Sequence, residues 1–197
     1  TQLLQSNASL FETSNKSGLT LPPTLLNVVR SRDGNLSDPN NSVVNATQFH
    51  PQSDEDSPLL MTAGMDKMLR FFRINDDNNN GENTKIHGIH FPKMPITCAS
   101  FLGGSGSSSS NVVLSGRRPF FYVYDAISGS IRKIPSIIGS SERSLERFVV
   151  SPPSSCNRSM IAFIGNDGYI ILVDGVTYQW IGDLKMNGSV RAVTFSE

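Results

Sequence analysis

The sequence predicts an all-β domain built from repeated four-stranded sheets, and two observations lead to that prediction. The first is self-similarity: the order apolar strand, glycine-led turn, apolar strand recurs at residues 59–74, 112–125 and 160–174. The turn glycines of the three copies, which are 52 and 49 residues apart, are Gly64, Gly116 and Gly165. The second is that no helical pattern of more than a few turns interrupts the series. Folds whose strands are joined by helical crossovers are thereby excluded.

Each repeat has one further strand on either side, which makes a four-stranded unit. The preceding strands are predicted at residues 44–49, 96–101 and 147–151, and the following strands at 85–91, 130–138 and 180–186. Such units arranged around a ring are the blades of a β-propeller. The repeat is longer than the WD40 norm of about 40–45 residues. The surplus lies in polar, loop-forming stretches at residues 53–57, 76–83, 103–110 and 152–157. We therefore predict a WD40-type β-propeller with its long loops on one face.

The strand count predicts an incomplete ring. Residues 1–23 form a lead-in segment, and residues 24–31 supply an outer strand. Blades span about 43–91, 95–138 and 146–187, and a fourth begins at Val190. Because a closed propeller needs at least four blades, residues 24–197 are expected to form a partial propeller of about three blades plus flanking strands. Such a piece would expose an apolar flank and a strand edge.

Composition excludes several classes of protein. The 17 basic residues balance 17 acidic ones, so the net charge points to neither nucleic acid nor a membrane. No apolar run approaches the roughly 20 residues that span a bilayer, and the first residues do not resemble a signal peptide. Cys98 and Cys156 lack metal-type spacing and are expected to be reduced thiols. We expect a soluble, intracellular protein with no membrane partner.

No motif for catalysis, metal binding or cofactor binding is found. His87 and His90 are three residues apart in a predicted strand, which places them on opposite faces, and His50 precedes a proline at a strand end. None of these histidines has a Ser or Cys partner at a recognisable spacing. Residues 103–106 are not followed by the Gly-Lys-Ser/Thr of a phosphate loop. We predict a protein that is not an enzyme and that takes no metal, cofactor or small-molecule substrate.

The residues around the turn glycines receive a structural interpretation. Asp66 and Asp167 lie two residues after the glycine, where a carboxylate accepts backbone N–H bonds and fixes a tight turn. Arg118 holds that position in the second repeat, so that turn must be held differently. Ser53, which precedes an acidic run at residues 54–56, has two interpretations. It is either an acidophilic kinase site or part of a solvated loop.

Basic residues form the candidate binding site. In a four-stranded blade, the turns between the second and third strands and the connections between blades lie on one face. In this sequence these segments carry Lys67, Arg117, Arg118, Lys93 and Lys185. Such side chains would bind RNA phosphates or an acidic partner. The alternative is ordinary solvated surface charge.

Several dispersed motifs carry a family resemblance. Those of the first two blades are Phe49-His50-Pro51, Ala63-Gly64-Met65-Asp66, Lys85-Ile86-His87, Pro95-Ile96 and Tyr122-Val123-Tyr124-Asp125. Later ones occupy residues 165–170 and 185–191, and residues 21–30 look like a lead-in to the propeller. Over roughly residues 18–196, the sequence resembles the family of U3 small nucleolar RNA-associated protein 18, whose propeller has seven blades.

The resemblance implies a non-catalytic scaffold of the small-subunit processome in the nucleolus, which supports pre-18S ribosomal RNA processing and ribosome assembly. It implies as partners other WD40 proteins of the processome, the U3 small nucleolar ribonucleoprotein and pre-ribosomal RNA. The family provides no catalytic residues to carry over. A generic WD40 adaptor that joins proteins in another intracellular assembly is the alternative function. A propeller enzyme is disfavoured because the first strands of the blades carry almost no ionisable residues.

Overall fold

The computed structural model describes residues 31–53, 58–75, 83–103, 110–137, 142–152 and 159–196. Apart from Ser31, these residues belong to one compact unit, Arg32–Glu197. Some expected segments lie outside the described residues. They are the lead-in at 1–23, the outer strand at 24–31 except for its last residue, and most of the long loops, at 54–57, 76–82, 104–109 and 153–157.

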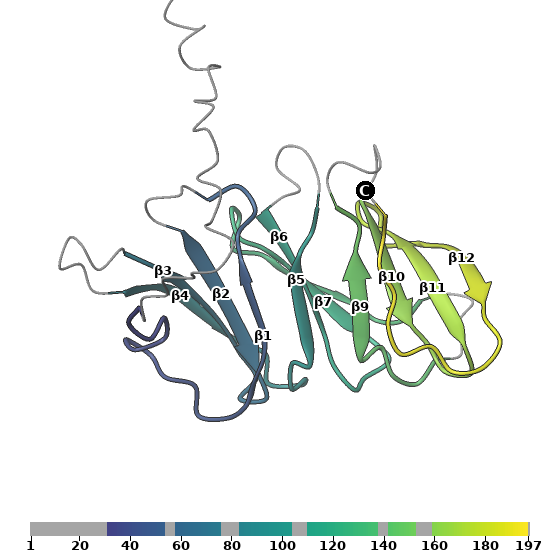
Figure 1. Ribbon diagram of the computed structural model, residues 1–197, viewed down its shortest axis with the longest axis horizontal. Helices are drawn as coiled ribbons and strands as arrows, with labels where there is room; N and C mark the ends of the chain where they lie inside the picture. Colours follow the sequence, from purple (N-terminus) through teal and green to yellow (C-terminus); the bar gives the residue numbers. More distant parts are fainter. Residues whose placement is uncertain are drawn as a thin grey trace, which may run out of the picture. The chain divides into compact units, whose positions relative to one another are not determined.

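In the described part of the chain, the strands form three four-stranded antiparallel sheets (Figure 1). Sheet 1 consists of β1 (Val44–Phe49), β2 (Leu59–Gly64), β3 (Met68–Arg73) and β4 (Thr84–His90). Sheet 2 consists of β5 (Cys98–Phe101), β6 (Asn111–Ser115), β7 (Phe121–Asp125) and β8 (Ile131–Ile134). Sheet 3 consists of β9 (Arg147–Val150), β10 (Met160–Ile164), β11 (Tyr169–Asp174) and β12 (Trp180–Lys185). The strands of each sheet are neighbours in chain order, and the described residues contain no α-helix, so the predicted all-β class is confirmed.

The three sheets adjoin one another through their first strands, with β5 between β1 and β9. Side chains at these contacts bond to the backbone of the next sheet. The Asn45 side chain donates to the Ile96 carbonyl at 2.9 Å, and the Gln48 side chain accepts from the Phe101 amide at 3.0 Å. Between the second and third sheets, the Thr97 hydroxyl donates to the Glu146 carbonyl at 2.9 Å. The sheets therefore follow one another in space in the order of the chain.

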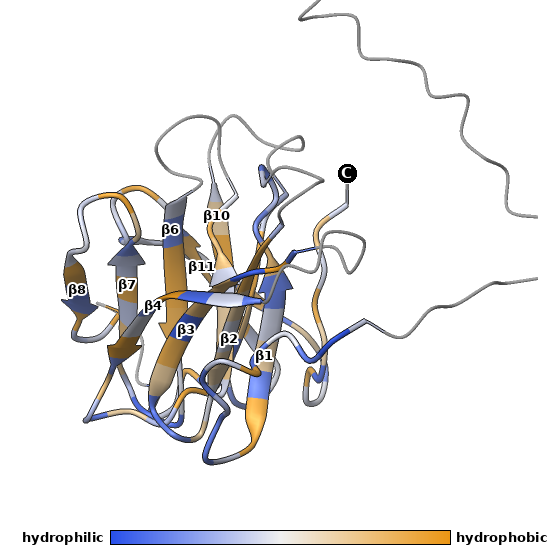
Figure 2. Ribbon diagram, turned by 90° about the vertical axis from the view of Figure 1, so that its left-hand side faces the viewer, coloured by the Kyte–Doolittle hydropathy of each residue, from blue (hydrophilic) through white to orange (hydrophobic). Residues whose placement is uncertain are grey.

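Two hydrophobic cores hold the sheets together, one on each face of sheet 2. On β6, Val112 and Leu114 belong to the core shared with sheet 1, whereas Val113 belongs to the core shared with sheet 3. Tyr122 and Phe121 of β7 divide in the same way. Burial on both faces explains why these strands are continuous apolar runs rather than alternating ones. Figure 2 shows β3 and β6 as largely hydrophobic, while the outer strands β4 and β8 carry hydrophilic positions.

Strand direction gives each sheet two ends. We call the end with the β2–β3, β6–β7 and β10–β11 turns and the connections between sheets the turn end; it is lower in Figure 1. The other connections lie at the loop end. Residues 190–196, where a further first strand is predicted, form no strand. A strand needs a hydrogen-bonded neighbour, and this segment pairs with none of the described strands, so the fourth blade stays a prediction.

Candidate functional site

The turns need glycine at these three positions because another part of the chain passes close to each of them. A Cβ atom on Gly64 or Gly116 would collide with a carbonyl just ahead of the first strand of the same sheet, and one on Gly165 would meet the Glu142 carboxylate. The left-handed φ values in these turns fall instead on Lys67, at 63°, and on Asp167 and Gly168, at 53° and 82°. Each turn is therefore pressed against the chain that enters a sheet, and this contact fixes the shape of the turn end.

Asp66 closes its turn and also neutralises a buried charge. Its Oδ1 accepts from the Met68 amide at 3.2 Å, and its Oδ2 accepts from Arg70 Nη1 at 2.5 Å. The Arg70 Nε donates to Asp38 Oδ2 at 2.9 Å, and Lys85 Nζ lies 2.6 Å from the same oxygen. The bonds from Lys85 and Arg70 lower the pKa of Asp38. This network ties the segment before sheet 1 to its third and fourth strands.

Two glutamates of the β8–β9 connection support the other two turns. Glu142 accepts from the amide and the side chain of Asn166, at 2.9 and 2.7 Å, and so supports the β10–β11 turn. Glu146 pairs with Arg117 at 3.1 Å beside the β6–β7 turn. In that turn the Arg118 amide donates to the Gly116 carbonyl at 2.7 Å. Neither glutamate is marked by a local motif, so neither role could be predicted from the sequence.

The five predicted basic residues all lie at the turn end, but three of them have partners: Arg117 pairs with Glu146, and Lys67 and Lys185 bond to carbonyls. Lys67 Nζ donates to the Pro92 carbonyl at 3.1 Å. Lys185 Nζ donates to the Asp167 carbonyl and lies 4.0 Å from the centre of the Tyr169 ring. The side chains of Arg117, Arg118 and Lys93 are exposed at this end.

Arg143 and Arg147, which the sequence did not single out as site residues, also lie exposed at this end. Within the described residues, the guanidinium groups of Arg118, Arg143 and Arg147 make no ion pair or hydrogen bond. We call Arg117, Arg118, Arg143, Arg147 and Lys93 the arginine face. A hollow of about 310 Å³ opens on it where β1, β5 and β9 begin, and its lining comprises Val43, Asn45, Met65, Thr97, Arg117, Glu146 and Arg147. Exposed guanidinium groups beside a hollow can bind an anion, because their planar fork of donors matches phosphate and carboxylate.

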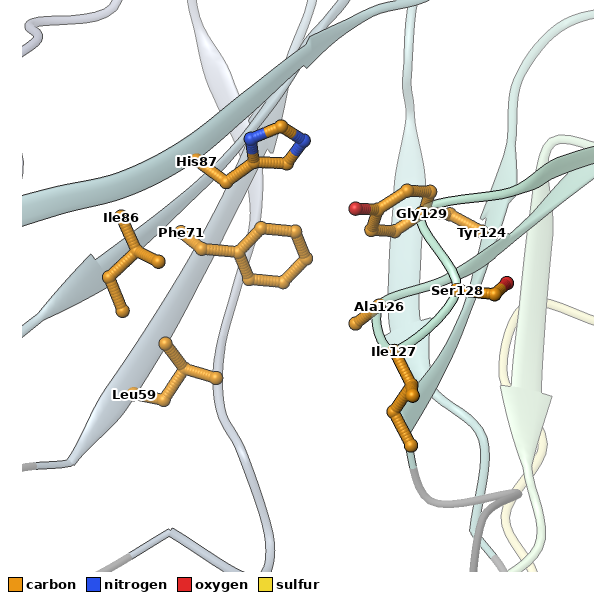
Figure 3. Close-up of a pocket in the computed structure, with 9 residues that line it drawn as sticks. All are labelled: Leu59, Phe71, Ile86, His87, Tyr124, Ala126, Ile127, Ser128 and Gly129. Carbon is orange, nitrogen blue, oxygen red and sulfur yellow. The ribbon is translucent and has the colours of Figure 1, made fainter.

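An apolar groove of about 490 Å³ lies between sheets 1 and 2 at the loop end. Figure 3 shows its sheet 1 wall facing the β7–β8 turn; the lining residues are Leu59, Phe71, Ile86, His87, Tyr124, Ala126, Ile127, Ser128 and Gly129. The His87 ring stacks on Tyr124 with their centroids 6.4 Å apart. Ile86 and Ile127 at its rim are 50% and 73% exposed. The groove therefore has the chemistry to accept an apolar side chain.

The remaining candidates have packing contacts. His50 packs edge-on against Phe101, with ring centroids 4.8 Å apart. The Cys98 thiol donates to the Phe148 carbonyl at 3.7 Å, and burial raises the pKa of that thiol, whereas Cys156 lies outside the described residues. In the described ranges, no group of three His, Cys, Asp or Glu side chains is placed to hold a metal ion. The same ranges contain no helix long and apolar enough to cross a membrane.

Comparison with known proteins identifies relatives, although no protein-family model matches the chain. A U3 small nucleolar RNA-associated protein 18 homolog of Arabidopsis thaliana is 45% identical over 165 residues, which are 84% of this chain and 27% of that protein. U3 small nucleolar RNA-associated protein 18 of Saccharomyces cerevisiae is 28% identical over 96% of the chain and 33% of its own length. The Homo sapiens homolog is 29% identical over 98% of the chain and 32% of its length. The chain thus spans about a third or less of these relatives.

Proposed function

We infer that this chain serves ribosome biogenesis as a non-catalytic scaffold, because it belongs to the family of U3 small nucleolar RNA-associated protein 18. One observation carries the inference: similarity to plant, fungal and human members extends over at least 84% of the chain. The three sheets described above therefore fall within the shared region. The relatives' name associates them with U3 RNA, and the proposal extends that association to this chain.

We propose further that the three sheets are consecutive blades of a WD40-type β-propeller with seven blades. Three features support it. Each sheet is a four-stranded antiparallel meander, as in a propeller blade. Neighbouring sheets touch through their first strands, which in a propeller line the central channel. Cores fill the spaces between successive sheets. In this arrangement the blades span about 43–91, 95–138 and 146–187, within a domain from residue 24.

In this proposal the protein acts in the nucleolus, within the small-subunit processome, and supports maturation of 18S ribosomal RNA. Its partners there are other WD40 proteins, the U3 ribonucleoprotein and pre-ribosomal RNA. The surfaces that the structure offers suit such a role. The arginine face can bind an anionic partner, and the apolar groove can accept a side chain of a neighbouring protein.

The proposal is tested by affinity purification of the tagged protein from cells, with sequencing of the RNA that co-purifies. We expect enrichment of U3 RNA and of 18S precursors, and accumulation of unprocessed precursors after depletion. Phe121→Asp, which places a charge in the core between sheets 2 and 3, serves as the misfolded control and should abolish enrichment. Normal precursor processing after depletion, with no U3 RNA in the purified sample, would refute the proposal.

The apolar groove gives the second candidate its support. A generic WD40 adaptor would use such a groove to hold an apolar side chain of a protein in another assembly. In the same purification this function predicts a stable set of protein partners without U3 RNA. Ile127→Asp at the exposed rim would then remove a partner and leave precursor processing unchanged.

A further inference from the structure

We propose that the arginine face binds the phosphodiester backbone of single-stranded RNA, with Arg147 at the hollow as the central phosphate ligand. This inference rests on the proposed function, which brings the chain into contact with RNA, and it adds the surface and the residues. Arg118 and Arg143 extend the contact on either side, and Lys93 adds a further positive charge at the same end of the sheets.

Unpaired arginines gather on this face. Several other described basic side chains have partners: Arg70 bonds to two carboxylates, Lys85 to one, and Lys185 to a carbonyl and an aromatic ring. Arg73, which is exposed, lies apart from them at the loop end. Arg118, Arg143 and Arg147 have no such partner among the described residues. This holds although Glu142 and Glu146 directly precede Arg143 and Arg147 in the chain. A guanidinium group left without a carboxylate is available to donate two parallel hydrogen bonds to a phosphate.

Acidic side chains at the turn end offset these charges only in part. Asp66 is paired with Arg70 and Glu146 with Arg117, while Glu142, which bonds to the neutral Asn166, and Asp167 keep their negative charges. The balanced net charge of the chain therefore conceals a basic turn end, which attracts a polyanion.

The lining of the hollow favours RNA over an acidic peptide. Beside Arg117 and Arg147, it includes Val43 and Met65, whose side chains are 66% and 40% exposed. A nucleotide presents an apolar base face next to its phosphate, and proteins bind single strands by combining cationic groups with contacts to that face. An acidic side chain would satisfy the arginines and leave the apolar half of the hollow uncovered.

The test is ultraviolet crosslinking of the tagged protein in cells, with Arg147→Glu compared with Arg73→Glu. Both arginines are exposed, but Arg73 ends β3 at the loop end, so it is the matched control for charge reversal. We expect Arg147→Glu to reduce RNA crosslinked per protein at least fivefold, Arg147→Lys to retain most of it, and Arg73→Glu to leave it unchanged. Unchanged thermal unfolding of each variant excludes misfolding as the cause.

A second measurement uses purified protein and a 20-nucleotide oligouridylate, with affinity followed against salt concentration. Each lost phosphate contact should reduce the slope of log K against log salt by about 0.7. Arg118→Glu combined with Arg147→Glu should therefore reduce it by about 1.4. An unchanged slope and unchanged crosslinking would overturn the inference. So would loss of an acidic protein partner from the Arg147→Glu sample with RNA crosslinks intact.

The two proposals fail in different ways. If the wild-type protein co-purifies with U3 RNA but Arg147→Glu crosslinks normally, the scaffold function stands and the arginine face is not the RNA contact. If the wild-type protein co-purifies without U3 RNA and precursor processing is normal, the scaffold function itself is refuted. Oligouridylate binding that depends on Arg147 would then still support RNA binding by this face.

Discussion

Arg70 holds a positive charge where sheet 1 buries it, with 3% of its surface exposed. A buried charge without a partner costs several kcal/mol. Asp66 and Asp38 offset that cost, because each accepts one hydrogen bond from the Arg70 guanidinium. The same two carboxylates serve different purposes. Asp66 shapes the β2–β3 turn, and Asp38 holds the entering segment to sheet 1.

Replacement of Arg70 by Leu should destabilise the protein by about 3–5 kcal/mol, because Asp66 then keeps a buried charge without its cation. Urea denaturation followed by tryptophan fluorescence measures the change. Arg73→Leu, on the exposed end of the same strand, is the control and should change stability by about 0.5 kcal/mol or less. Equal effects of the two substitutions would show that the Asp66–Arg70 pair is not what the fold depends on.

Asp38 gives this network a pH dependence whose sign follows from its lowered pKa. The hydrogen bonds from Lys85 and Arg70 favour the ionised carboxylate in the folded state. The resulting stability is therefore present above the unfolded pKa of about 3.9 and is lost as pH falls through the lower folded pKa. Asp38→Asn should reduce Tm at pH 7, and the difference from wild type should shrink steadily below pH 4. A Tm difference that stays constant from pH 7 to pH 3 would contradict this role.

Residue spacing alone placed Asp66 in its turn and the five basic residues at one end of the sheets. It did not reveal Asp38, 32 residues before Arg70, nor the support that Glu142 gives to Asn166, 24 residues later. Such pairs form only when segments distant in the sequence fold against the same sheet. For the same reason, spacing did not show that Lys67, Lys185 and Arg117 have partners. It also did not point to Arg143 and Arg147.

The β7–β8 and β11–β12 turns have the same hydrogen-bond pattern. In each, an Asp at the end of a strand accepts from the amides two and three residues on: Asp125 in the first turn and Asp174 in the second. The residue that follows in the left-handed region is Gly129 in one turn, with φ of 67°, and Tyr178 in the other, with φ of 59°. Glycine adopts this region freely, whereas a residue with a Cβ pays about 1–2 kcal/mol.

Packing of the Tyr178 ring offsets that conformational cost. The ring belongs to the core between sheets 2 and 3, with its centroid 6.4 Å from that of Phe121. Its hydroxyl accepts from the Asn111 side chain at 3.4 Å, and the Arg132 guanidinium lies 5.7 Å from the ring centroid. A turn of sheet 3 is thereby fastened to sheet 2.

Tyr178→Gly should therefore destabilise the protein even though it relieves the backbone. Loss of a buried aromatic ring costs about 3–5 kcal/mol, and relief of the left-handed conformation returns about 1–2, which leaves a net loss of about 2 kcal/mol. Denaturant unfolding measures it. Gly129→Ala, where an added Cβ would meet nothing within 4 Å, isolates the backbone cost and should lose about 1 kcal/mol. A more stable Tyr178→Gly protein would refute the anchoring role of the ring.

Strands were the best predicted elements, because apolar runs mark them directly. The predicted fourth strand at 180–186 became β12 at Trp180–Lys185, while the one at 130–138 shortened to β8 at Ile131–Ile134. The chain turns away after Ile134 because Ile137 packs into the core between sheets 2 and 3. An apolar residue just beyond a strand looks like part of that strand in the sequence, so the boundary was not predictable.

For the whole molecule, the order of the sheets follows from the repeat, but the way they join does not. The sequence predicted four-stranded units in series, and three such sheets are present. Their junctions depend on Asn45, Gln48 and Thr97, whose side chains bond to backbone groups 49 to 53 residues away. Polar residues in a first strand carry no sequence signal that separates a junction from a solvated position.

This architecture predicts a gradient of amide hydrogen exchange across each sheet. Amides of β6 and β7 should exchange slowest, because both strands are paired on both edges and lie between two cores. Amides of β12 should exchange fastest among the strands, because one edge is unpaired and its Trp180, Ile181 and Leu184 side chains are about half exposed. Hydrogen exchange measured by mass spectrometry at peptide resolution tests the order. Protection of β12 equal to that of β7 would mean that another polypeptide pairs with its free edge, which would make the outer strand of sheet 3 a binding edge.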